Sequence, residues 1–198
     1  KVVDEGLIGK ITMGRGRVAH SAALDKWFAD GNWFGDAERA GGGALFDLGC
    51  HRIDVIRWLM GEPKSVSAII NNFTNTYDID DNSVTLVEFE NNAIGVVDVT
   101  WIHRSGPNLL ELYGTEGSII LGHPKGPVMT STKLSEEEIQ ELLANPPESI
   151  SSPMQQWISA VLKDTPMTIT IQDGRNLTEL LQAAYMSAED GKAVKLPL

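Results

Sequence analysis

Cysteine and basic residues are scarce in this chain of 198 residues, and long apolar runs are missing. The one cysteine, Cys50, excludes an internal disulfide and is typical of a reducing compartment, so we predict a cytoplasmic protein. Acidic residues outnumber basic ones by 27 to 16, which gives a formal charge of −11. This balance argues against nucleic acid and anionic membranes as partners. No run approaches the roughly 18 apolar residues of a spanning helix.

Hydrophobic residues make up 42% of the chain and charged residues 22%, which is typical of a globular protein, here taken as one domain over residues 1–198. Alternation and turn residues predict strands at Lys10–His20, Ser65–Asn72, Ser83–Phe89, Ala93–Ile102, Leu109–Tyr113 and Ser118–Leu121. Helices are predicted over Ala44–Met60, after the capping box of Ser135 and Glu138, after Ser152–Pro153, and through Leu177–Ala188 up to Gly191. Short turns between strands favour antiparallel pairing. We therefore predict an α+β fold with a large, mostly antiparallel sheet, helices on one face, and an open second face.

The predicted helix over Ala44–Met60 carries a compact polar face that is unusual for a merely solvated helix. On a helical wheel its members are Asp47, Cys50, His51, Asp54 and Trp58, and they include no lysine or glutamate. Asp47 and His51 stand four residues apart, where side chains on a helix are neighbours. A carboxylate beside an imidazole suits general acid–base catalysis, although this spacing alone is more often a structural hydrogen bond.

Two other interpretations of this face stay open. Asp47, His51 and Asp54 would offer metal donors to a metal-dependent sugar isomerase or lyase, if another segment supplied more ligands. The polar face would instead be structural in a non-catalytic oligomerisation module.

The glycines of this chain give no nucleotide-binding fingerprint. Gly41–Gly43 opens the helix without a G-x-G-x-x-G spacing, and Gly14-Arg15-Gly16 lacks a third glycine. We therefore assign no cofactor-binding residues to this chain and interpret Gly41–Gly43 as a sharp bend into the helix.

Gly41–Asp54 (GGGALFDLGCHRID), followed by Trp58 and Gly61, resembles the signature of the Gfo/Idh/MocA oxidoreductase family. Further segments agree in order along nearly the whole chain: Glu5–Ile11, Gly114–Ser118, and Asp173–Ala188 with Gly191. By this resemblance, His51 matches the family's active-site histidine and Asp47 the aspartate that accompanies it.

The resemblance implies a two-domain enzyme that transfers hydride between NAD or NADP and a sugar, inositol or related polyol. An N-terminal Rossmann domain would bind the cofactor. The second domain, of the dihydrodipicolinate-reductase-like or glyceraldehyde-3-phosphate-dehydrogenase-like kind, would shape the substrate site and form homodimers or homotetramers through its open sheet. The dinucleotide fingerprint and the family's E-K-P motif are missing here. We therefore expect this chain to be the C-terminal domain alone, without bound cofactor and inactive by itself.

Weaker substrate-binding candidates flank these motifs. Trp33 precedes the glycine run, and Trp101, His103 and Arg104 stand at a predicted strand end, where a sugar could meet an aromatic face and a cation. The alternative interpretations are a core aromatic residue and a surface loop.

Overall fold

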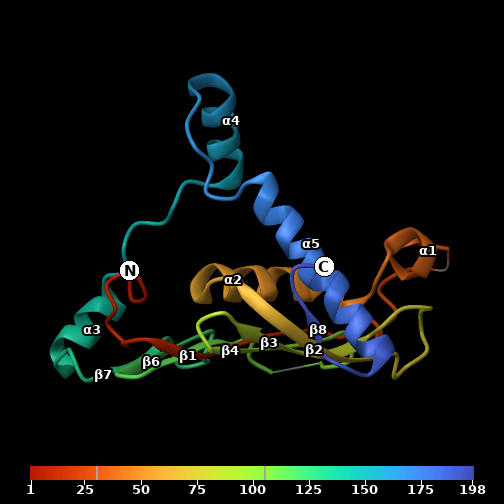
Figure 1. Cartoon of the computed structure of the whole chain (residues 1–198), viewed down its shortest axis with the longest axis horizontal. Coiled ribbons are helices and arrows are strands. Elements are labelled where there is room, and N and C mark those ends of the chain that lie inside the picture. Colours follow the sequence, from red (N-terminus) through yellow and green to blue (C-terminus); the bar gives the residue numbers. More distant parts are fainter. Residues whose placement is uncertain (30, 105) are drawn as a thin grey trace.

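The fold is built on one eight-stranded mixed sheet, seen edge-on in Figure 1, in a computed structural model that describes residues 1–29, 31–104 and 106–198. The strands are β1 Ile11–Ala19, β2 Pro63–Asn71, β3 Asn82–Phe89, β4 Ile94–Thr100, β5 Leu110–Gly114, β6 Gly117–Leu121, β7 Val128–Ser131 and β8 Val194–Lys195. Their order across the sheet is β7-β6-β5-β1-β4-β3-β2-β8. Every neighbouring pair is antiparallel except β1 and β4, which run parallel. The prediction of a mostly antiparallel sheet is confirmed.

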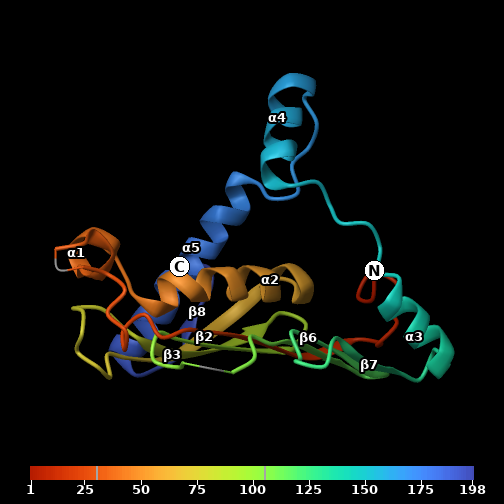
Figure 2. The ribbon, with the colours of Figure 1, turned by 180° about the vertical axis from the view of Figure 1, so that it is seen from behind.

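Helices cover one face of this sheet, as predicted. The helices of the described residues are α1 Ala37–Ala40, α2 Cys50–Met60, α3 Glu136–Ala144, α4 Pro153–Lys163 and α5 Ile171–Asp190, with a 3-10 turn η1 at Trp33–Gly35 and a π-helical turn η2 at Leu45–Gly49. Figures 1 and 2 show α2 and α5 lying over the sheet, α3 beside β7, and α4 standing away from the rest of the molecule. Within the described residues, no helix combines the length and apolar character that a membrane crossing needs.

Two glycines of β1 let α2 lie close to the sheet. A Cβ atom on Gly14 would lie 2.4 Å from the Met60 sulfur, and one on Gly16 would lie 3.1 Å from Cβ of Arg52. The fully buried Ile53 and Ile56 of α2 belong to the same core. The absence of side chains on this stretch of β1 therefore fixes how close the site-bearing helix comes to the strands.

The opposite face of the sheet is open and mixed in character. Leu86 is 47% exposed and Ile69 is 70% exposed on this face. Ion pairs also lie across its strands, Arg15 with Glu111 at 3.7 Å and Arg17 with Asp98 at 3.5 Å. An apolar surface with paired charges around it is the kind of surface that protein interfaces use.

Candidate active site

The expected site helix is not a continuous α-helix. Its first turn, η2, has the wider i→i+5 pattern, and regular α-helix begins only at Cys50. Among the described residues, no hydrogen bond or ion pair joins the side chains of Asp47 and His51. The helix predicted over Ala44–Met60 is confirmed, and its first turn is π-helical.

A buried carboxylate holds the entry to this turn. Asp80 is 8% exposed. Its two side-chain oxygens accept hydrogen bonds from the backbone N–H groups of Gly43 and Leu45, each at 2.8 Å. The hydroxyl of Tyr185 also donates to Asp80, at 2.8 Å. A Cβ atom on Gly43 would lie 1.9 Å from the backbone oxygen of Asp80, so no other residue fits there without movement. The glycine run thus serves a bend and a close backbone approach, with Gly41 in the left-handed region at φ 78°.

Asp47 contacts two aromatic N–H groups that come from distant parts of the chain. The indole Nε1 of Trp101 donates to Asp47 Oδ2 at 3.1 Å, and His20 Nε2 lies 3.8 Å from the same oxygen. Trp101 is fully buried. The sequence candidate Trp101 is therefore a core aromatic residue that reaches the site through its N–H group and not through an exposed ring face.

His20 is the site residue that sequence reasoning missed. Its Nδ1 accepts the N–H of Ala22 at 3.2 Å, so the neutral ring carries its proton on Nε2, on the side of Asp47. The ring stacks on Trp27 at 4.7 Å and lies nearly parallel to Trp101 at 6.3 Å. Burial lowers the pKa of His20, and the negative charge of Asp47 opposes this shift.

Parallel pairing explains how His20 reaches this place. The register sets Ala19 at the end of β1 beside Thr100 at the end of β4. The next residues, His20 and Trp101, therefore leave the sheet together. No local pattern in the sequence indicates this meeting, because it depends on a pairing between strands far apart in the chain.

The other polar residues of the predicted face do not converge. Burial, followed by the charge of Asp47, raises the pKa of the Cys50 thiol, which donates to the Asp47 backbone oxygen at 3.1 Å. Burial also raises the pKa of Asp54. His51 is exposed at the beginning of α2. Within residues 1–29, 31–104 and 106–198, no three His, Cys, Asp or Glu side chains are grouped so that they could hold a metal ion.

The remaining sequence candidates lie around the stacked rings of His20, Trp27 and Trp101. His103 Nδ1 accepts a hydrogen bond from the Arg17 guanidinium at 2.6 Å. The backbone N–H of His103 donates to the backbone oxygen of His20 at 3.2 Å. Arg104 forms an ion pair with Asp25. Trp33 is 50% exposed and packs edge-on against Phe34 at 5.0 Å. The structure therefore brings His103 and Trp101 to the site directly, and Trp33 through its neighbour.

The fold, with its bent entry into a site-bearing helix, is that of a C-terminal domain found in a family of oxidoreductases. The family model of the GFO/IDH/MocA C-terminal domain matches residues 1–120, and the chain belongs to this family. It is 30% identical over 154 residues, 63% of this chain, to levoglucosan dehydrogenase of Pseudarthrobacter phenanthrenivorans. It is 28% identical over 203 residues, 98% of this chain, to scyllo-inositol 2-dehydrogenase (NAD(+)) of Bacillus subtilis.

A solved structure shows the same fold. The WlbA dehydrogenase from Bordetella pertussis, in complex with NADH and UDP-GlcNAcA, superimposes with a TM-score of 0.83 over all of this chain at 21% identity. The chain covers 60% of that protein, 57% of the scyllo-inositol dehydrogenase and 38% of the levoglucosan dehydrogenase. It is thus similar to one part of each longer protein.

Proposed function

We propose that this chain is the substrate-binding, catalytic-residue-bearing C-terminal domain of an NAD- or NADP-dependent oxidoreductase that acts on a sugar, inositol or related polyol. A dinucleotide-binding domain elsewhere in the same protein would hold the cofactor. The observation that carries this proposal is the family match over residues 1–120, which includes the glycine run, Asp47 and His51. The names of the two relatives, a levoglucosan and a scyllo-inositol dehydrogenase, support the substrate class.

His51 is our proposed acid–base residue. When an alcohol is oxidised, its carbinol C–H leaves as hydride to the nicotinamide, and its O–H proton must go to a base. His51 is exposed at the beginning of α2, so its ring can reach a substrate hydroxyl without displacing core residues. The imidazole can take up this proton and return it in the reverse direction.

Asp47 supplies negative charge beside this position. Because Trp101 and His20 both direct N–H groups at its Oδ2 oxygen, the carboxylate is held in one orientation. We propose that Asp47 stabilises the imidazolium of His51 and accepts a hydrogen bond from a hydroxyl group of the substrate. Trp27, stacked on His20 and 56% exposed, and Trp33 offer aromatic faces to the apolar side of a sugar ring.

The open sheet face supports a further part of the proposal, self-association into a dimer or tetramer. Leu86 and Ile69 lie exposed there beside the ion-paired Arg15 and Arg17. The single cysteine favours a cytoplasmic location for the assembled enzyme.

The proposal is tested with the full-length enzyme, NAD(+) or NADP(+), and a panel that includes levoglucosan and scyllo-inositol. Wild-type protein should oxidise at least one of these polyols. His51→Asn should lower kcat by about 10²–10⁴-fold, the usual loss of a general base. Asp47→Asn should also lower kcat, because the neutral amide no longer stabilises the imidazolium.

A matched control is His123→Asn, at a histidine in the segment between β6 and β7 that joins in none of these contacts. This variant should keep wild-type kcat. The assignment fails if His51→Asn keeps wild-type hydride-transfer rates between pH 6 and 9 with an unchanged melting temperature.

A further inference from the structure

The two oxygens of the Asp47 carboxylate have different surroundings. Oδ2 accepts the indole N–H of Trp101 at 3.1 Å and lies 3.8 Å from Nε2 of His20. Oδ1 accepts no hydrogen bond among the described residues, and the Asp47 side chain is 27% exposed. The fold therefore holds one oxygen and leaves the other available to His51 or to a substrate hydroxyl group.

The His20 ring is fixed by its backbone and by aromatic packing. Its backbone N–H donates to the Thr100 oxygen at 3.1 Å, and its backbone oxygen accepts the N–H of His103 at 3.2 Å. The ring centroid lies 4.7 Å from that of Trp27 and 6.3 Å from that of Trp101, and the planes are within 23° of parallel. These contacts leave the ring little rotational freedom, so its Nε2 atom stays directed at the carboxylate.

The turn after β1 decides which nitrogen of His20 carries the proton. Nδ1 accepts the backbone N–H of Ala22 at 3.2 Å, so the neutral ring carries its proton on Nε2, facing Asp47. A second proton would sit on Nδ1, where it would face the N–H of Ala22. Protonation therefore costs His20 this hydrogen bond. The neutral ring directs an N–H group at Asp47 without cancelling the charge of the carboxylate.

Asp47 is the charged group that acts on the His20 ring. Burial lowers the pKa of His20, and the negative charge of Asp47 opposes this shift. Lys26, on the turn after β1, is exposed, so solvent screens its charge. Other charged or titratable side chains on the segments packed around His20 have partners of their own: Arg17 with His103, Arg104 with Asp25, and Cys50 with the backbone oxygen of Asp47.

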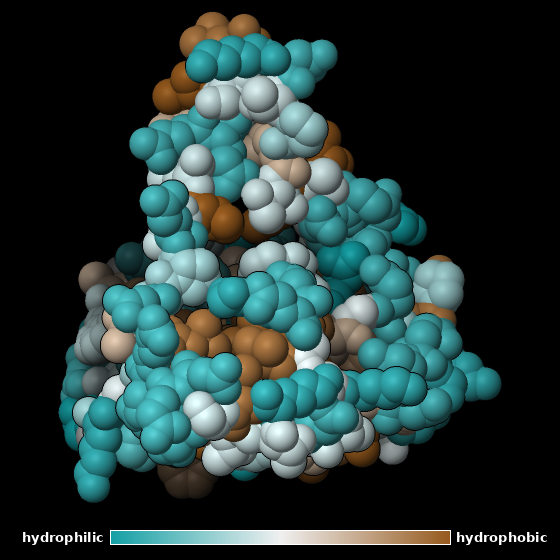
Figure 3. Space-filling view, turned by 90° about the vertical axis from the view of Figure 1, so that its left-hand side faces the viewer, coloured by the Kyte–Doolittle hydropathy of each residue, from teal (hydrophilic) through white to brown (hydrophobic). Residues whose placement is uncertain are grey.

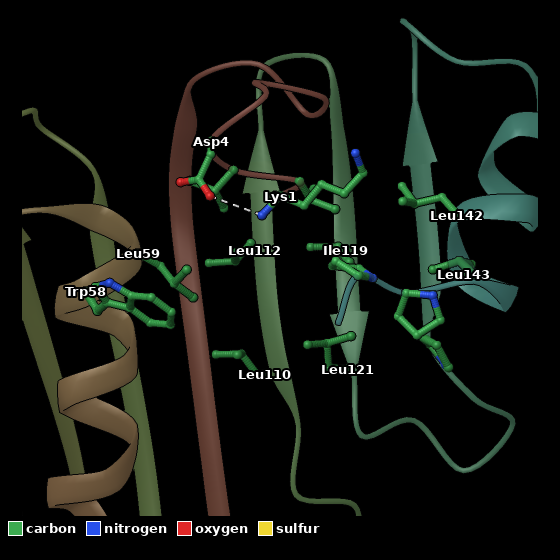
Figure 4. Close-up of a pocket in the computed structure, with 15 residues that line it drawn as sticks. Lys1, Asp4, Trp58, Leu59, Leu110, Leu112, Ile119, Leu121, Leu142 and Leu143 are labelled. Atoms are coloured by element: carbon green, nitrogen blue, oxygen red, sulfur yellow. Dashed lines mark hydrogen bonds and ion pairs between the residues drawn. The ribbon is translucent and has the colours of Figure 1, made fainter. Parts of the chain in front are cut away.

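The charges at the opposite end of the site helix lie far from His20. This end of the molecule shows apolar surface framed by hydrophilic residues (Figure 3). Trp58, near the end of α2, lines an apolar cavity there, together with the ion pair of the Lys1 amino group and Asp4 at 3.1 Å (Figure 4). The 11 residues of α2 span about 16 Å, more than the screening length in physiological salt. The ion pair at that end therefore has little effect on His20.

We infer that His20 is a positioning residue for Asp47. Its neutral N–H group orients the carboxylate and leaves the full charge available to His51, and a second proton on His20 removes this support. The inference rests on the proposed function and deepens it. Protonated His20 would cancel the charge that stabilises the imidazolium of His51. His20 is not itself the base, because its accepting nitrogen is occupied by the N–H of Ala22.

Two variants of the full-length enzyme separate the N–H group of His20 from its ring. His20→Phe keeps an aromatic ring but has no N–H, and should lower kcat at pH 8 about tenfold, near the lower end of what a hydrogen bond to a charged group contributes. KM should change less than kcat, because the imidazolium charge develops in the transition state. His20→Gln restores an amide N–H near the position of Nε2, so its kcat should stay within about threefold of wild type. His123→Gln is the matched control and should leave kcat unchanged.

The pH dependence of kcat provides a readout that a packing role does not share. In the wild-type enzyme, His20 and His51 must both be unprotonated for full activity, whereas in His20→Gln only His51 must be. Between pH 7.5 and 5, wild-type kcat should therefore fall about threefold or more further than that of His20→Gln. Equal falls in the two proteins overturn the inference. Wild-type kcat in His20→Phe also overturns it, and so does a His20→Gln enzyme that is as slow as His20→Phe at pH 8.

NMR of the protein labelled with ¹⁵N-histidine tests the contact without turnover. At pH 8 the His20 ring should be neutral with its proton on Nε2, and Asp47→Asn should lower its titration midpoint, because the carboxylate that favours the imidazolium is gone. A proton on Nδ1, or a midpoint that Asp47→Asn leaves unchanged, overturns the inference. If both NMR results are as expected but the wild-type enzyme oxidises no polyol, the proposed function fails while the support of Asp47 by His20 stands.

Discussion

Replacing Asp80 with asparagine tests whether this buried carboxylate holds the entry to the site helix. Asp80 accepts three hydrogen bonds at 2.8 Å: from Gly43 N and Tyr185 O–H on one oxygen, and from Leu45 N on the other. Asparagine has nearly the same shape but only one accepting oxygen. If the asparagine oxygen takes the position that accepts from Gly43, its NH₂ group faces the N–H of Leu45, so that two donors face each other.

The expected loss follows from these bonds. A hydrogen bond to a charged group contributes about 1.5–3 kcal/mol, and a buried donor left unpaired costs about 1–3 kcal/mol. With the remaining two bonds weakened by the loss of charge, Asp80→Asn should lower the free energy of unfolding by about 3–5 kcal/mol. For a chain of this length, this corresponds to a decrease in melting temperature of about 6–20 °C.

Circular dichroism during thermal and urea unfolding measures this change. Tyr185→Phe removes only one hydrogen bond to Asp80 and should cost about 1.5–3 kcal/mol. Asp78→Asn, at an exposed aspartate two residues earlier, is the matched control and should stay within about 0.5 kcal/mol of wild type. If Asp80→Asn melts within about 2 °C of wild type, Asp80 does not hold the helix entry.

Two further perturbations test the His20 environment and the open sheet face. Because burial lowers the pKa of His20 below 6.5, protonation favours the unfolded state, and wild-type stability should fall as the pH drops through and below 6.5. His20→Gln should remove this part of the pH dependence. Urea midpoints of both proteins at pH 7.5 and 5.5 measure it, and an identical drop in both would contradict the assigned burial. Leu86→Glu, which places a charge in the centre of the exposed apolar face, should shift the proposed oligomer toward monomer in light scattering at micromolar concentration, while Phe73→Glu should not. A wild-type protein that is monomeric throughout would refute the proposed sheet interface.

Local patterns in the sequence predicted most of the elements correctly. The capping box of α3, the Ser152 cap of α4 and Gly191 as the C-cap of α5 are present as predicted because each depends on residues three or four apart. The short strands β7 and β8 and the short turns η1 and α1 were not predicted. Four residues or fewer do not establish a periodic pattern, and the neighbouring strand determines their conformation.

The candidate site was only partly predictable for a different reason. The sequence indicated Asp47 and His51 through the helix that carries both. It gave no indication that Asp80 and Tyr185 would bend the first turn of that helix, or that His20 would reach Asp47. These contacts join segments from 27 to more than 100 residues apart. The interruption of the α-helix lies where they converge, since long-range hydrogen bonds there override local helix propensity.

The position of β1 has a consequence for how the protein folds. Strands β2 to β4 and β5 to β7 each follow one another with antiparallel pairing, so each group can form soon after its residues are synthesised. Within the sheet, β1 lies between the two groups and pairs with β4 roughly 80 residues and with β5 roughly 100 residues along the chain. The first strand of this sheet to be synthesised is therefore among the last to find its partners. Until β5 is made, the backbone of β1 stays open on one side, and another chain in the same state can pair with it.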